Sequence, residues 1–362
     1  MNKFADSHIH IRFVRYNEIE KMLDTIASIG VTDACLLALP YRSAAENLAA
    51  LYWKMHYQKM SVRAFGGLHI TDRYAAVPCE QQVQALLELG CDGIKIMDTH
   101  PNFRKYLGEG IDSPKYAQMF AMLERLGIPI NMHVNDPEDQ WEPGGLYADP
   151  SMPSKQQIYE EVFTVLDRYP KLKITFAHFF FLSAYPEEAE RVLQKYPNVR
   201  FDLTPGTEMY YNFPKNIEFW HEFFTKYSDR ILFGTDSNTL KTCNVELNRL
   251  VYRTLTESHD LFTQNCYGRD FVMRGLQLDH EVVERICYQN YIDFVGEVPK
   301  PVNKEMFNEC CERVLADIKT NPEDQFYIAG GELIPDLKKD PAQKIATDFC
   351  EGALGLRERR FV

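Results

Sequence analysis

Eight short apolar segments alternate with longer segments of helical periodicity, and this alternation is the feature that most constrains the fold. Parallel strands need long crossover connections, which are usually helices, so the alternation predicts a parallel sheet. Eight repeats favour an α/β fold of the (β/α)8 TIM-barrel type over an open doubly wound sheet. The expected strands are Phe4–His10, Asp33–Leu39, Val62–Ile70, Gly93–Met97, Ile128–Val134, Leu172–Phe179, Val199–Thr204 and Arg230–Asp236.

The segments between the expected strands carry helix signals. Three of them stop at a glycine just before the next strand, at Gly30, Gly90 and Gly127. A glycine there suits the left-handed cap that ends a helix in an αβ loop. Apolar residues three and four apart predict a buried stripe on each of three helices. These stripes are Ile19, Met22, Leu23 and Ile26, then Val83, Leu86 and Leu87, then Met119, Met122, Leu123 and Leu126.

The pattern changes near residue 297, which suggests two parts. We expect residues 1–296 to form the barrel and residues 297–362 to form a mostly helical C-terminal extension packed on it. One helix is expected at Lys304–Ile318, followed by an irregular stretch that includes Asn321–Asp324 and Gly330–Gly331.

Composition excludes some functions and favours others. The 362 residues carry a formal net charge of -12, which argues against nucleic acid and anionic membranes as partners. The nine cysteines lack C-x-x-C spacing, as expected of reduced thiols inside a cell. The N-terminus has no apolar signal core, and no stretch of about 18 apolar residues predicts a membrane span. We therefore expect a cytoplasmic protein that binds a small-molecule substrate, with a homodimer possible.

Two histidines end the first expected strand, in the segment Asp6-Ser7-His8-Ile9-His10. Side chains alternate faces along a strand, so His8 and His10 point the same way, with Asp6 one layer deeper on that face. Both imidazoles can therefore converge on one metal ion. A polar strand end with two ordinary histidines is the alternative.

Metal-capable side chains end three further strands. His133 ends the fifth, His178 the sixth and Asp236 the eighth. In parallel barrels the reactive residues sit at the carboxyl ends of the strands, where these side chains would meet. Singly, His133 and His178 could be core histidines and Asp236 a helix cap, but the ordered coincidence favours a shared site.

At this point the chain resembles the amidohydrolase superfamily. Within it, the chain is similar to the amidohydrolase-related (amidohydrolase 2) group that includes aminocarboxymuconate-semialdehyde decarboxylase. The resemblance covers roughly residues 1–296. It is carried by Asp6-x-His8-x-His10, Gly93-Ile94-Lys95, His133, Phe176-Ala177-His178, Leu232–Asp236 and Asn290 in Tyr288–Tyr291.

The resemblance implies one divalent metal ion, most often zinc, held by His8, His10, His133 and Asp236. Mixed imidazole and carboxylate ligation suits zinc and leaves a position for water. The resemblance also implies that His178 is the general acid or base, and that Asp236 orients or deprotonates the water while touching the metal.

Other strand-end residues are weaker candidates. In binuclear relatives a carbamylated lysine bridges two metals, so Lys95 could do so, although an uncharged or substrate-facing lysine is the favoured interpretation. Asp6 and Asp202 could accept hydrogen bonds from ligands or be purely structural carboxylates. Substrate contacts are expected from residues at or after the strand ends: Lys95, His69, Arg12, Arg42 and Tyr210.

Two reactions fit this ligand set. The first is metal-dependent hydrolysis of a small ester, lactone or amide by metal-activated water. The alternative is a metal-dependent non-oxidative decarboxylase of a small unsaturated or aromatic carboxylic acid, which would need an arginine near the substrate carboxylate. A catalytically silent barrel and a phosphate-binding isomerase fit less well, because the ligand set is intact and the turns after strands seven and eight are not glycine-rich.

Overall fold

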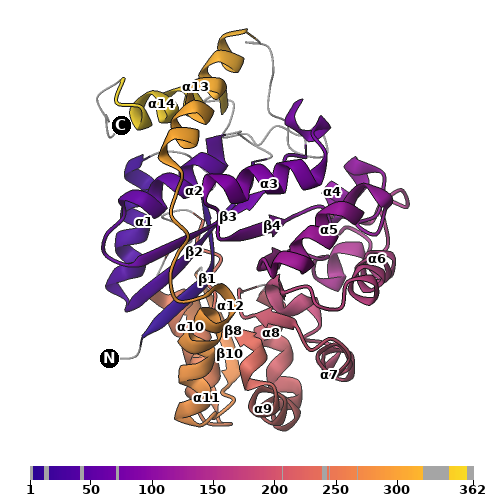
Figure 1. Cartoon of the computed structure of the whole chain (residues 1–362). Coiled ribbons are helices and arrows are strands. Elements are labelled where there is room, and N and C mark those ends of the chain that lie inside the picture. Colours follow the sequence, from indigo (N-terminus) through magenta and orange to yellow (C-terminus); the bar gives the residue numbers. More distant parts are fainter. Residues whose placement is uncertain are drawn as a thin grey trace.

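The computed structural model describes residues 3–11, 16–40, 45–70, 73–205, 207–238, 243, 245–266, 268–320 and 342–356. Its centre is an eight-stranded parallel sheet in which the strands follow one another in chain order (Figure 1). The prediction of a TIM barrel is therefore confirmed. The strands are β1 Phe4–Ile11, β2 Val31–Ala38, β3 Ser61–Gly67, β4 Gly93–Ile96, β5 Ile130–Met132, β6 Ile174–Phe176, β7 Val199–Asp202 and β8 Ile231–Leu232.

The barrel closes where the chain beyond β8 meets β1. The amide of Ser7 donates to the Phe233 carbonyl (3.0 Å) and the amide of His10 donates to the Ser237 carbonyl (2.8 Å). Ile9 also forms a parallel bridge with Ser237. We call this contact between β1 and residues 233–237 the seam. It leaves β1 paired on both sides, so the exposed edge of an open sheet is avoided there.

Helices surround the sheet and bury their apolar stripes against it (Figure 1). Gly30, Gly90 and Gly127 all have positive φ, as the predicted caps require. The helices are α1 Tyr16–Ser28, α2 Ala45–His56, α3 Cys79–Leu89, α4 Pro101–Leu107, α5 Pro114–Leu126, α6 Lys155–Arg168, α7 Pro186–Lys195, α8 Thr207–Asn212, α9 Ile217–Lys226, α10 Val245–Thr256, α11 His280–Glu284, α12 Asn290–Val295, α13 Lys304–Thr320 and α14 Ala342–Ala353.

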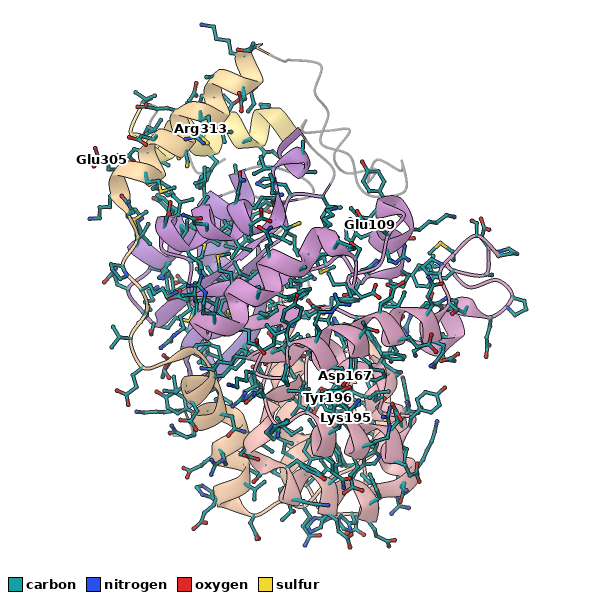
Figure 2. All side chains as sticks on the ribbon, turned by 45° about the vertical axis from the view of Figure 1, so that its right-hand side comes forward. Glu109, Asp167, Lys195, Tyr196, Glu305 and Arg313 are labelled. Carbon is teal, nitrogen blue, oxygen red and sulfur yellow. The ribbon has the colours of Figure 1, made fainter. Side chains whose placement is uncertain are left out.

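The outer surface of the helical layer is polar. Figure 2 shows Asp167 on α6 beside Lys195 and Tyr196 at the end of α7. The Lys195 ammonium lies 2.7 Å from Asp167 Oδ1, and the Tyr196 hydroxyl donates to the same carboxylate. Such exposed ion pairs add little stability, so the burial of the apolar stripes holds these helices in place.

Two features depart from the expected order of elements. The region 240–296 contains an antiparallel hairpin of β9 Leu261–Cys266 and β10 Arg269–Arg274, two strands beyond the eight that were expected. A π-helical turn at Arg285–Gln289 joins α11 to α12 in one irregular helical run.

The C-terminal helices pack on one side of the barrel. α13 covers the expected Lys304–Ile318 helix, and α13 and α14 lie against α2 at the top of Figure 1. Phe349 of α14 contacts the Tyr52 ring of α2, with ring centroids 5.9 Å apart. The expected irregular stretch at Asn321–Asp324 and Gly330–Gly331 lies outside the described residues. None of the described helices combines the length and apolar character that a membrane crossing requires.

Candidate metal centre and active site

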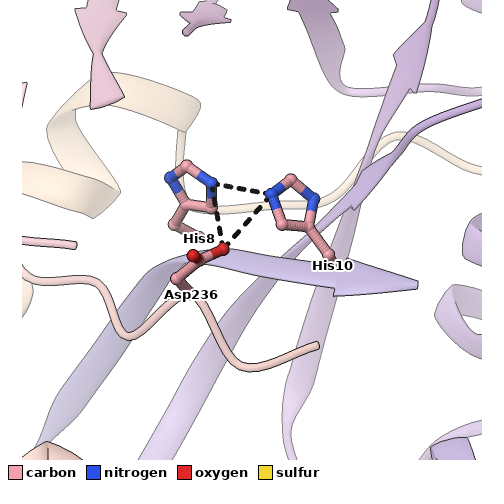
Figure 3. A group of neighbouring side chains, drawn as sticks. All are labelled: His8, His10 and Asp236. Carbon is pink, nitrogen blue, oxygen red and sulfur yellow. Dashed lines mark hydrogen bonds and ion pairs between the residues drawn. The ribbon is translucent and has the colours of Figure 1, made fainter. Parts of the chain in front are cut away.

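His8, His10 and Asp236 converge at the carboxyl end of β1 (Figure 3). The Nε2 atoms of His8 and His10 lie 3.0 Å apart. Asp236 Oδ1 lies 3.4 Å from Nε2 of His10 and 3.9 Å from Nε2 of His8. We call these three residues the metal trio. The predicted alternation of side chains along β1 is therefore what brings the two imidazoles together.

Each imidazole of the trio is held through its other nitrogen. His10 Nδ1 donates to the Leu37 carbonyl at 3.2 Å, since a carbonyl oxygen can only accept. His8 Nδ1 lies 2.9 Å from Asp202 Oδ2. Burial, with the charges of Lys95 and His133, holds the pKa of His8 well below its ordinary value. With Nδ1 of each ring held in this way, the two Nε2 atoms face each other.

This donor set fits a divalent cation. A positive charge between two imidazole lone pairs and a carboxylate oxygen would be attracted by all three. Two imidazoles and one carboxylate are also ligands that zinc and similar ions accept. The Asp236 side chain keeps 27% of its surface exposed, so the trio opens on the solvent side.

Asp236 reaches the trio because the chain turns sharply after β8. Its φ is +54°, which is a left-handed conformation that Asp tolerates better than most residues. Its amide donates to the His8 carbonyl at 2.9 Å, within the seam. The closure of the barrel therefore brings the carboxylate to the two histidines.

Asp202, at the end of β7, is the polar centre beneath the trio. Its Oδ2 accepts from the Asn131 side chain (3.2 Å) as well as facing His8 Nδ1. Its Oδ1 accepts from the backbone amides of His178 (2.9 Å) and Thr204 (3.2 Å). One buried carboxylate thus orients His8 and the backbone that carries His178, which is the ligand-supporting role considered from the sequence.

Asp6 lies below the trio, as expected, and binds the seam. Its Oδ2 accepts from the Thr235 hydroxyl (2.6 Å), and its Oδ1 accepts from the amides of Thr235 and His8. Burial raises the pKa of Asp6 to about 7, against the effect of these hydrogen bonds. These contacts hold together the two chain segments that carry the metal trio.

His178 lies beside the trio with one nitrogen committed to the backbone. Its Nδ1 donates to the Thr204 carbonyl at 3.3 Å, which leaves the lone pair on Nε2. Burial, then the charges of His133 and His8, hold the pKa of His178 well below its ordinary value. The side chain is therefore neutral at neutral pH and suited to accept a proton.

The backbone at His178 is left-handed over four residues. His178, Phe179, Phe180 and Phe181 have φ of +55°, +55°, +56° and +50°, where non-glycine residues are disfavoured. The expected strand Leu172–Phe179 therefore ends early, at Phe176. Phe179 packs among rings of α9, including Trp220 and Phe224, and this packing offsets the backbone strain.

Five imidazole rings form a continuous row across the barrel mouth. Ring centroids are 4.8 Å apart for His10 and His8, 5.6 Å for His8 and His178, 4.9 Å for His178 and His133, and 5.0 Å for His133 and His100. The metal trio lies at one end of this row, and His133 and His100 lie at the other.

His133 therefore joins a second group, with His100 and Asp136. Its Nε2 donates to the Asn135 carbonyl (2.8 Å) and lies 3.6 Å from Asp136 Oδ1. His100 Nε2 lies 3.4 Å from Asp136 Oδ2. Although burial acts in the opposite direction, the hydrogen bond from His133 and the nearby imidazoles hold the pKa of Asp136 below its usual range. His133 as a ligand of the trio's ion stays a prediction, with Nδ1 as its remaining lone pair.

Lys95 is buried on β4, and its Nζ donates to Asn131 Oδ1 at 2.7 Å. Burial lowers the pKa of Lys95 to about 8, while the charges of Asp202 and Asp236 oppose that shift. Lys95 is thus linked through Asn131 to Asp202 and to His8.

The structure places two of the other predicted substrate contacts, His69 and Tyr210, and does not describe the remaining two. His69 lies beside a cavity of about 200 Å³ that α3 and α13 help to line, and its amide donates to the Gln82 side chain. Tyr210 is buried, and its hydroxyl donates to the Leu203 carbonyl at 3.0 Å. Arg12 and Arg42 lie outside the described residues.

Sequence reasoning missed His100, Asp136, Asn135 and Glu208, all near the barrel mouth. His100 is the N-cap of α4, just after β4, and Asn135 and Asp136 follow His133 by two and three residues. Extending the search a few residues past each strand end would have found these three. Glu208 lies further on, in α8, where no motif marks it.

Comparisons with known proteins identify the family of the chain and its shared fold. A sequence profile described as Amidohydrolase matches residues 40–295, a segment that begins after His8 and His10. No curated protein matches the chain at the significance required.

Solved structures share the barrel at low sequence identity. An uncharacterised TIM-barrel protein, Bb4693 from Bordetella bronchiseptica, is 16% identical with a TM-score of 0.52, covering 81% of this chain and 98% of its own. A 2,6-dihydroxybenzoate decarboxylase complexed with 2,6-dihydroxybenzoate is 15% identical with a TM-score of 0.50, covering 82% and 99%.

A dihydroxybenzoic acid decarboxylase from Polaromonas sp. JS666, with bound manganese and the inhibitor 2-nitroresorcinol, is 13% identical with a TM-score of 0.50. The match covers 82% of this chain and 97% of that one. These structures establish the shared fold, and the profile extends over more than half of the sequence. The chain therefore belongs to the amidohydrolase family, a family of enzymes.

Proposed function

We propose that this protein is a metal-dependent hydrolase acting on a small-molecule ester, lactone or amide, with zinc as the ion. The observation that carries the proposal is the metal trio itself. Two imidazoles aim their Nε2 atoms at each other across 3.0 Å, and the Asp236 carboxylate faces both. These three side chains together form a ligand set that fits a divalent cation, and imidazole with carboxylate ligands favours zinc.

A divalent ion bound by the trio, with His133 as the proposed fourth ligand, would lower the pKa of water and polarise a substrate oxygen. The chain supplies the rest. Asp202 fixes the ring of His8, and the Leu37 carbonyl fixes the ring of His10. His178 Nε2 takes up a proton, since its Nδ1 proton is held by the Thr204 carbonyl. We assign Asp236 a second role, in orienting the attacking water.

Decarboxylation of a small unsaturated or aromatic carboxylic acid is about as well supported. Two solved structures with this fold are decarboxylases of dihydroxybenzoic acids, one of them with manganese bound. On this chain, His178 would carry the proton to the ring carbon, and Arg12 or Arg42 would hold the carboxylate. Both reactions use the same ligands, so the choice between them is experimental.

Metal content tests the site. Protein purified without chelator should hold about one zinc per chain, measured by elemental analysis, and His8→Ala should lose most of it because one ligand is removed. His280→Ala is the matched control, since His280 is exposed on α11. Retention of metal by His8→Ala would refute the trio, and about two ions per chain would instead revive a carbamylated, bridging Lys95.

Product analysis separates the two reactions. Lactones and small esters should be hydrolysed with release of acid, whereas salicylate-type acids would release carbon dioxide. Acid release without carbon dioxide supports hydrolysis, and the reverse result supports the decarboxylase. We also propose a cytoplasmic location. We propose in addition that the protein is a homodimer, and sedimentation of the purified protein would test this.

A further inference from the structure

Glu208 is a buried carboxyl group outside the metal trio. Both of its carboxylate oxygens are buried, and neither accepts a hydrogen bond from another residue among those that the structure describes. It belongs to α8, which follows β7 at the barrel mouth and packs against the turn that carries His178. Burying a carboxylate without a hydrogen-bond donor costs free energy, so Glu208 would be stabilised by a ligand that donates hydrogen bonds to it.

A second unpaired acceptor lies in the same region. Asn135 Oδ1 is also buried and has no partner within the described part of the chain, whereas Asn135 Nδ2 donates to the Lys155 carbonyl at 3.1 Å. Tyr159 is a neighbour of both groups. Burial raises the pKa of Tyr159 well above its ordinary value. A hydrogen bond from Asn135 lowers that pKa, and the negative charge of Glu208 raises it. The same hydroxyl donates to the Phe180 carbonyl in the left-handed turn.

The charges around Glu208 indicate which ligand would complete it. Burial raises the pKa of Glu208 to about 7, and the charges of Asp136 and Asp139 add to this shift, while its own backbone amide and the charge of Lys155 oppose it. Lys155 is engaged elsewhere, because its ammonium lies 3.3 Å from Glu138 Oε2 and over the Trp141 ring. Acceptors without donors, in negative surroundings, match a group that carries several N–H donors and a positive charge.

We propose that Glu208 and the side-chain carbonyl of Asn135 form a recognition subsite for a primary ammonium group on the substrate. This inference rests on the proposed function in that the bound molecule is taken to be the substrate of the metal site. Asp136 links the subsite to the metal site. Its Oδ1 lies 3.6 Å from His133 Nε2, and the His133 ring is next to that of His178 in the histidine row. The substrate class would then be an amino-bearing carboxylic acid or its ester, lactone or amide.

The test uses ethylammonium as the probe and ethanol as its uncharged match, titrated calorimetrically into the metal-loaded full chain at constant ionic strength. Wild-type protein should bind ethylammonium saturably and ethanol at least 10-fold more weakly. Glu208→Gln should weaken ethylammonium binding about 10- to 100-fold, as expected for a hydrogen bond to a charged group. Asp139→Asn, which removes a nearby exposed charge but no unpaired acceptor, should change it less than threefold.

Several results would overturn the subsite: no saturable binding of ethylammonium, equal binding of ethanol, or equal losses in Glu208→Gln and Asp139→Asn. If Glu208→Gln does not fold, the wild type still decides, because affinity for ethylammonium should rise as the pH is raised through 7 and Glu208 ionises. A flat profile would count against the proposal. Metal content is measured on the same samples, so a failed metal site with intact ethylammonium binding refutes the proposed function alone.

Discussion

A single carboxylate, Asp202, decides which nitrogen of His8 is free. Its Oδ2 lies 2.9 Å from Nδ1 and therefore keeps the proton away from Nε2, the atom that faces His10. The same oxygen accepts from Asn131, which in turn accepts from Lys95. The usable lone pair of His8 is thus set by residues from three other strands of the barrel.

Asp202→Asn should weaken metal binding about 10- to 100-fold, because the amide cannot fix the His8 tautomer as a carboxylate does. Competition with a calibrated chelator measures the affinity. Asp229→Asn is the control, since Asp229 is exposed in the turn before β8. Unchanged affinity in Asp202→Asn would show that His8 is oriented by packing alone.

His178 should leave a signature in acid stability. Its pKa in the folded protein lies well below that of the unfolded chain, so below about pH 6.5 the unfolded chain binds a proton that the native protein does not. Stability from this residue is present above pH 6.5 and is lost as the pH falls.

In His178→Asn the slope of unfolding free energy against pH should therefore be smaller, by about 0.7 kcal/mol per pH unit at pH 6.5 and by about 1.4 kcal/mol per pH unit at pH 5. Urea unfolding at several pH values measures it. The comparison is made against the wild type because Asp6 and Glu208, whose pKa values are raised to about 7, contribute slopes of opposite sign. An identical slope in the variant would mean that His178 is charged in the native state.

At the scale of elements, the turn after β6 is the least regular part of the site. Four consecutive left-handed residues cost about 1–2 kcal/mol each, and their side chains hold them there. The Phe181 ring stacks on His178 with centroids 5.1 Å apart and also contacts His133 at 5.7 Å. The turn therefore supports two rings of the histidine row at once.

Glycine and alanine at position 181 test that conformation. Both variants lose the phenyl ring, but Phe181→Gly should be about 1 kcal/mol more stable than Phe181→Ala, because glycine accepts a positive φ without strain. At Phe120, inside α5, the order should reverse by about 1 kcal/mol. Denaturant unfolding of the four variants measures this. The same order at both positions would contradict the left-handed turn.

The sequence predicts elements well where the signal is periodic. All eight strands and the three glycine caps were predicted, because apolar runs and cap residues depend on local chemistry. The turn at Phe179–Phe181 was not, because three phenylalanines resemble a continuing strand until their packing against α9 is known. The hairpin β9–β10 was missed although its residues alternate in exposure, since two short strands among helices give a weak pattern.

The candidate site also has a part that local sequence patterns predict and a part that depends on tertiary packing. His8 and His10 were predicted to converge from the two-residue period of a strand, which needs no tertiary information. Which group His133 joins depends on the direction of its ring, and that is set by the Asn135 carbonyl and Asp136. The unpaired oxygens of Glu208 arise from packing between distant loops, so no local pattern could reveal them.

At the scale of the whole molecule, the metal trio bridges the seam. His8 and His10 come from β1, whereas Asp236 follows β8. An ion bound by all three would therefore join the first and last strands of the barrel. Asp6 and Thr235 make the same connection by hydrogen bonds one layer below.

Metal removal should accordingly lower thermal stability. With free zinc at about 1,000 times its dissociation constant, binding adds about 4 kcal/mol to the free energy of unfolding, and a chelator should remove it. Thermal melts with and without chelator measure the shift, and His8→Ala should show almost none. Equal melting temperatures of the metal-loaded and chelated wild type would argue that the trio does not hold the ion.

The seam also dictates when the site can exist during synthesis. β1 emerges from the ribosome before the other strands of the barrel, but one of its two neighbours is made more than 220 residues later, at Phe233–Ser237. Contacts so distant in sequence form late in folding. A nascent chain shorter than Asp236 therefore carries two of the three ligands without the third, and the complete trio appears only after the ring of strands has closed.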